Sequence, residues 1–240
     1  MKLPSHLYAV LIGVIVAAVI FATGQIVPAV NSYQAEMRIW LVGRATGIAA
    51  VVLLTAVVAL GILLSHPEQA RWKQAKRLYP VHESIWVFSL AFVIVHIVSL
   101  AADEYAGVGW TGALVPGLST YRTPAVALGT FAGYALVITG LSARFSNALP
   151  TGWWLKLHRF AVVVLALGWT HGVLAGTDTL ALAALYGGLG LSVVAAAAYR
   201  YWTVRRRAGR PVRPVATSSP AAQPSSIPAA MAPSMESSDV

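Results

Sequence analysis

The chain contains no cysteine. It therefore cannot form disulfides, supply thiolates to a zinc site or an iron–sulfur cluster, or attach haem through thioethers. Charged residues make up only 10% of its 240 residues, whereas a soluble domain of this length has about 25%. Hydrophobic residues make up 58%, and the mean hydropathy is +0.70. This composition excludes an ordinary soluble domain and indicates an integral membrane protein.

Six apolar segments follow one another along the chain. Each approaches the ~20 residues that a helix needs to cross about 30 Å of hydrocarbon. The first is longer than the hydrophobic region of a signal peptide, so we expect an uncleaved helix. The predicted fold class is all-α: an integral membrane six-helix bundle within residues 1–204, with helices at about 7–30, 40–64, 82–101, 124–143, 157–174 and 180–202.

Residues 205–240 have a different composition, first basic and then rich in proline, alanine and serine. Such a segment has little apolar surface to bury, so we predict a disordered cytoplasmic tail. It contains no glycine-rich dinucleotide fingerprint. We therefore do not expect this chain alone to oxidise NAD(P)H.

The formal net charge of +9 is unevenly distributed. Lysine and arginine gather between the second and third segments, near the start of the fifth, and after the sixth. By the positive-inside rule, both termini lie in the cytoplasm of a cell-membrane protein. The acidic residues Glu36, Asp103, Glu104 and Asp178 then lie on the outer side. The basic excess is thus interpreted as a topology signal and a contact with membrane lipid, with no nucleic-acid partner.

Four of the six histidines lie in two of the predicted helices: His82 and His96 in the third, His158 and His171 in the fifth. Both helices run from inside to outside. Separations of 14 and 13 residues correspond to about 21 and 20 Å along a helix. The pattern therefore predicts an inner pair, His82 with His158, and an outer pair, His96 with His171.

Paired imidazoles at matched depths suit haem iron, which accepts one ligand from each face and needs no carboxylate. Helix-bundle interiors commonly hold such cofactors. We therefore predict two non-covalent haem b groups with these four histidines as axial ligands of the haem iron. On an ideal helix, His171 would point about 140° away from His158. The fifth helix should therefore be distorted, for example at Gly168, unless His158 lies at its frayed start.

Haem propionates are anionic, and arginines near the helix ends are candidates to bind them. On the outer side these are Arg44 and Arg122, and on the inner side Arg159 and Arg77. The alternative is that these side chains extend to the membrane interface.

Two other interpretations of the histidines stay open. They could relay protons in a non-redox transporter or proton-conducting protein, since polar residues at membrane depth are usually functional. The chain could also be a structural subunit of a membrane complex that keeps the bundle without a cofactor.

The histidine motifs, H-x13-H in the third helix and H-x12-H starting within WWLKLHRF, resemble the ferric reductase-like transmembrane domain. So do the TG that follows Arg44 and the STYRTP before the fourth helix. This superfamily includes ferric reductases, NADPH oxidases and the membrane haem subunit of the bacterial methionine sulfoxide repair system. The resemblance covers about residues 40–199.

The resemblance implies six helices that bind haem b and pass electrons across the membrane. It also implies the same pairs of ligands, His82 with His158 and His96 with His171. The larger members carry flavin and nicotinamide domains that are not found here. Electrons would then come from a separate cytoplasmic flavoprotein or from quinol. The chain would be the electron-transfer component of an oxidoreductase, and its outer acceptor could be ferric iron, oxygen, a quinone or a periplasmic redox protein.

Overall fold

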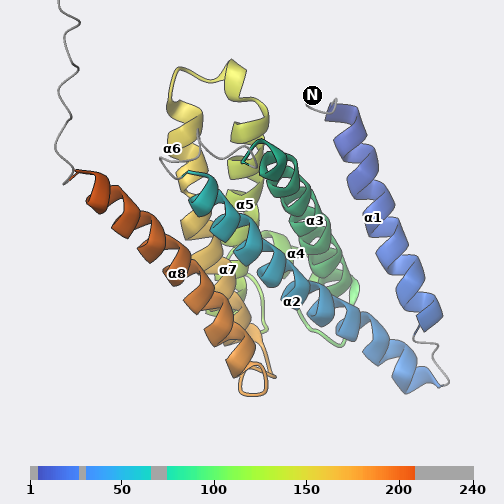
Figure 1. The fold of residues 1–240 in the computed structure, drawn as a ribbon. Helices are drawn as coiled ribbons and strands as arrows, with labels where there is room; N and C mark the ends of the chain where they lie inside the picture. The colour runs from blue at the N-terminus through green and yellow to red at the C-terminus, as the bar shows by residue number, and fades with distance from the viewer. Residues whose placement is uncertain (1–4, 27–30, 66–74, 209–240) are drawn as a thin grey trace, which may run out of the picture.

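The computed structural model describes residues 5–26, 31–65 and 75–208, and in this part of the chain all regular structure is helical (Figure 1). The all-α prediction is therefore confirmed for the described residues. The elements are α1 (Ser5–Ile26), α2 (Ser32–Leu64), α3 (Ala75–Ala102), α4 (Gly109–Leu114), α5 (Thr123–Arg144), the 3-10 turn η2 (Ser146–Ala148), α6 (Trp153–Arg159), α7 (Ala161–Ala175) and α8 (Ala183–Ala208).

Among the described residues, four stretches of helix are long and apolar enough to cross a membrane: Ser32–Leu64, Arg77–Ala102, Thr123–Arg144 and Trp153–Ala175. Their surfaces expose large apolar side chains, including Phe131, Ile138, Phe160 and Val163. Soluble proteins rarely expose such surfaces over a wide area, so these helices are suited to contact with membrane lipid. α1 contributes a shorter apolar stretch, Val10–Val19.

The helices pack as two pairs, α2 with α3 and α5 with α7, which are joined by contacts between α2 and α7. α2 lies along α3, and α5 lies along α7; α2 also contacts α7 and α8, while α1 rests against α3 (Figure 1). The hydrophobic core joins the two pairs, with Leu54, Val57 and Val58 from α2, Leu136 from α5, and Val164 and Leu165 from α7. This packing fixes α3 and α7, the helices that carry three of the four histidines, on either side of α2.

α2 and α3 begin well before the residues that hydropathy predicted. α2 starts at Ser32 rather than at residue 40, because the side chain of Asn31 caps it by accepting a 2.8 Å hydrogen bond from the backbone N–H of Gln34. α3 starts at Ala75 rather than at residue 82 and includes Pro80. Hydropathy marks the apolar part of a helix, whereas backbone hydrogen bonding continues into its polar flanks.

The predicted fifth helix, 157–174, is broken into α6 and α7 at Phe160. There the backbone N–H of Phe160 donates to the carbonyl of Leu157, only three residues earlier, at 3.0 Å. This tighter turn rotates each residue by more than the α-helical 100°, which is the direction needed to align His158 with His171. The expected distortion is present, but placing it at Gly168 was wrong, since α7 runs unbroken through that residue.

The last helix also extends beyond its predicted end. α8 covers Ala183–Ala208 rather than 180–202, so residues 205–208, assigned to a disordered tail, are helical. The rest of the predicted tail, 209–240, lies outside the described residues, as do residues 27–30 of the first predicted helix.

Candidate functional site

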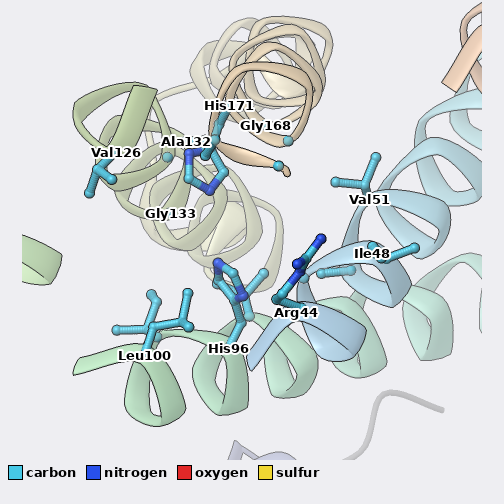
Figure 2. A pocket seen from close by; sticks show the side chains of 18 of the residues that line it. Arg44, Ile48, Val51, His96, Leu100, Val126, Ala132, Gly133, Gly168 and His171 are labelled. Atoms are coloured by element: carbon cyan, nitrogen blue, oxygen red, sulfur yellow. The ribbon is translucent and has the colours of Figure 1, made fainter. Parts of the chain in front are cut away.

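The structure brings the four histidines together in the two predicted pairs. His96 on α3 and His171 on α7 have ring centres 6.0 Å apart, with an angle of 78° between the ring planes. Figure 2 shows these two side chains pointing toward each other from different helices. His82 on α3 and His158 on α6 also have ring centres 6.0 Å apart, at 70°. The role of these residues as haem ligands stays a prediction.

The spacing of both pairs matches what one metal ion between two imidazoles requires. A metal–nitrogen bond of about 2.0–2.1 Å on each side, plus the ~1 Å from ring nitrogen to ring centre, places two opposed ring centres about 6 Å apart. The large interplanar angles do not conflict with this spacing, because two imidazoles that would hold one metal ion from opposite sides can be rotated relative to each other about the line that joins them. By ring spacing, His82 with His158 and His96 with His171 would each be able to hold a haem iron between them.

Backbone carbonyls of neighbouring helices orient the outer pair. Nδ1 of His96 lies 2.6 Å from the carbonyl oxygen of Gly43 on α2, and Nδ1 of His171 lies 2.7 Å from that of Ala125 on α5. A carbonyl only accepts hydrogen bonds, so each Nδ1 carries the proton and donates. Nε2 then keeps its lone pair for a metal, and the hydrogen bond fixes the ring orientation.

The inner pair has a looser version of this arrangement. The backbone of Val57 on α2 lies near the imidazole of His82, and that of Thr139 on α5 lies near the imidazole of His158. The Nδ1 atoms of the two inner histidines differ from those of the outer pair. Both nitrogens are buried, yet neither forms a hydrogen bond. The ring of Trp154 lies 6.1 Å from that of His158. The inner rings are therefore placed by packing rather than by a formed hydrogen bond.

A cavity of about 420 Å³ surrounds the outer pair. It is lined by side chains from several helices, most of them apolar, such as Ile48, Val51 and Leu100 (Figure 2). This volume lies within the range of about 300–1,000 Å³ typical of ligand and cofactor sites. Across the described residues, no three His, Cys, Asp or Glu side chains gather into a metal-binding group. The protein thus offers two imidazoles at each level, the number that a haem iron accepts.

Arg44 is the one predicted propionate-binding arginine that lines this cavity. Its guanidinium forms an ion pair with Asp178, in the segment between α7 and α8, and lies 4.3 Å from the ring centre of Trp40. The Arg44 side chain is 18% exposed and that of Asp178 is 54% exposed. The pair therefore places a cation beside the outer histidines and its counter-ion nearer the surface.

Arg122 and Arg159 have different surroundings. The Arg122 guanidinium donates hydrogen bonds to the carbonyls of Leu174, at 2.7 Å, and Gly176, at 3.2 Å. It thereby binds backbone groups at the C-terminal end of α7, a position that favours cations. Arg159 is the last residue of α6 and is exposed. A contact of either residue with a haem propionate stays a prediction.

Sequence reasoning missed several residues of the cavity. Tyr186 of α8 is buried in its lining, and Trp40, Tyr105 and Tyr121 also contribute. For Asp178 the sequence predicts only a position on the outer side. The available signal was weak: a tyrosine within the last apolar segment and an acidic residue just before it.

Comparison of the chain with protein-family models found no match, and comparisons with curated proteins and with solved structures found none either. The resemblance to the ferric reductase-like domain therefore depends on the histidine spacing and the short motifs of this sequence.

Proposed function

We propose that this protein is a membrane b-type cytochrome that binds two haem b groups and carries electrons across the membrane. The observation that carries the proposal is the repeated histidine pair: two sets of imidazoles, each with ring centres 6.0 Å apart, at two levels of the same bundle. His82 and His158 would hold the inner haem, and His96 and His171 the outer one.

The residues around the pairs suit this role. The Nδ1 hydrogen bonds of the outer histidines leave Nε2 directed away from the backbone, available to iron. Leu54, Leu136 and Val164 form part of both the core and the cavity lining, so they exclude water next to the ligands. When bound, haem would supply reversible one-electron chemistry, tuned by its ligands and its surroundings.

The proposed topology follows from the charge distribution. The six-helix bundle would have both termini in the cytoplasm, with α1 and α8 as the first and sixth crossings, because lysine and arginine concentrate on that side. The proposed donor is a separate cytoplasmic flavoprotein or quinol. An acceptor on the outer side completes the path.

The decisive experiment is an absorption spectrum of the purified protein, oxidised and reduced, after production with ample haem. Haem is quantified per chain in the same preparation. We expect spectra of a b-type cytochrome and two haems per chain. One haem would retain the electron-transfer class but remove one of the two proposed sites. None would overturn the proposal, and pH-dependent ion flux in vesicles made with haem-free protein would then support the proton-relay alternative.

A further inference from the structure

We infer that Gly47 and Gly129 are positioning residues for the outer histidine pair. Each leaves open the space through which an imidazole reaches a backbone carbonyl of the adjacent helix. This inference depends on the proposed function for its ligand, haem. The orientation of the histidines can nevertheless be tested without haem.

The distances around both glycines leave no room for a methyl group. A Cβ added to Gly47 would lie 2.7 Å from Nδ1 and 2.8 Å from Cε1 of His96. A Cβ added to Gly129 would lie 2.7 Å from Nδ1 and 2.8 Å from Cε1 of His171. Imidazole is a rigid ring, so it cannot yield by bending as the end of a flexible side chain can. The whole ring would have to move.

The two glycines occupy equivalent positions on different helices. The carbonyl of Gly43 accepts the hydrogen bond from His96, and Gly47 lies four residues after Gly43. The carbonyl of Ala125 accepts the hydrogen bond from His171, and Gly129 lies four residues after Ala125. In an α-helix the carbonyl of residue i points along the axis toward residue i+4. A side chain at i+4 therefore crowds that carbonyl, whereas glycine lets a second donor reach its free lone pair.

The inner pair lacks this close fit. Gly61 lies four residues after Val57, but a Cβ added there would be 3.2 Å from Cε1 of His82, so a small shift would accommodate it. Four residues after Thr139 the chain has Ala143, and Nδ1 of His158 forms no hydrogen bond. The outer histidine rings thus lie closer to the glycines beside them than the His82 ring of the inner pair lies to Gly61.

The first test compares haem content and reduced spectra of four single variants: Gly47→Ala, Gly129→Ala, Gly61→Ala and Gly188→Ala. Gly188 in α8 is the control, because a Cβ added there would meet nothing within 4 Å. We expect Gly47→Ala and Gly129→Ala each to reduce haem from two per chain toward one, with the inner haem spectrum unchanged. Gly61→Ala should keep most of its haem, and Gly188→Ala should match the wild type.

Two results would overturn the inference. One is retention of both haems with unchanged spectra and midpoint potentials in Gly47→Ala and Gly129→Ala. The other is simultaneous loss of both haems in these variants, which would indicate a general folding defect rather than a local effect on the outer pair.

The second test uses nitrogen NMR of haem-free protein labelled only in histidine. The wild type should show the Nδ1–H tautomer for His96 and His171. Gly47→Ala should change the His96 signal and leave that of His171, and Gly129→Ala should do the reverse. Unchanged signals in both variants would overturn the inference. The expected changes in a protein that never takes up haem would support the positioning role while the proposed function failed.

Discussion

Arg44 on α2 forms an ion pair with Asp178, 134 residues later in the chain, beside the cavity that contains His96 and His171. The contact joins α2 to the segment between α7 and α8, and thus ties together helices on both sides of the outer pair. Arg44 also lies against the ring of Trp40. A cation held by both an aromatic face and a carboxylate is fixed in place next to a candidate cofactor site.

Asp178→Asn should therefore lower stability slightly. Half-exposed ion pairs contribute up to about 1 kcal/mol, which corresponds to a decrease in Tm of about 2–4 °C for a chain of this size. Thermal unfolding in detergent, at low and high salt, measures the effect. The difference between wild type and variant should shrink at high salt because salt screens the pair. A difference that is independent of salt would assign the effect to packing instead.

Single alanine replacements of the histidines should separate the two haem sites. His96→Ala or His171→Ala should abolish the outer haem and spare most of the inner one, because the two pairs share no ligand. His82→Ala or His158→Ala should do the opposite. Haem per chain and reduced spectra report the outcome. Equal loss of both centres in every variant would contradict independent ligation.

Arg122→Ala should destabilise the end of α7 that follows His171. The change removes hydrogen bonds to the carbonyls of Leu174 and Gly176, with an expected cost of about 1 kcal/mol. Arg200→Ala is the matched control: Arg200 in α8 is also exposed, and a surface change of this kind usually stays within about 0.5 kcal/mol. Thermal unfolding of both variants in the same detergent checks this. Equal stability of the two would show that the Arg122 contacts contribute little.

The chain has no cysteine, so single introduced cysteines can report its topology without background. Glu104, after α3, and Arg206, near the end of α8, are both exposed. If α8 crosses the membrane, an impermeant maleimide added to intact cells should label Glu104→Cys and leave Arg206→Cys unmodified. Both should react after the cells are opened. Labelling of both variants in intact cells would show that α8 does not cross and would contradict the six-helix topology. Labelling of Arg206→Cys alone would instead show that the bundle has the opposite orientation.

The linear sequence determined the properties that depend on composition and on position along a helix axis. Scarce charge and long apolar runs indicated membrane helices, and four of these are long and apolar enough to cross in the structure. Every residue of a helix adds the same rise, so the 14 residues between His82 and His96 and the 13 residues between His158 and His171 span nearly equal distances along their helices. The pairing of His82 with His158 and of His96 with His171 could therefore be predicted. Helix ends were less accurate, because hydropathy does not register caps such as Asn31.

The tertiary structure decided what depends on rotation about the helix axes and on contacts between distant residues. The break at Phe160, rather than at Gly168, turns His158 toward its partner. Asp178 forms its ion pair with Arg44, whereas Arg122 donates hydrogen bonds to backbone carbonyls at the end of α7. The carbonyls that accept hydrogen bonds from His96 and His171 belong to other helices. Gly47 and Gly129 contact these histidines only when those helices pack together. The sequence sets how far apart two residues lie along a helix axis, but side-chain packing between helices sets which face each helix presents to its neighbours.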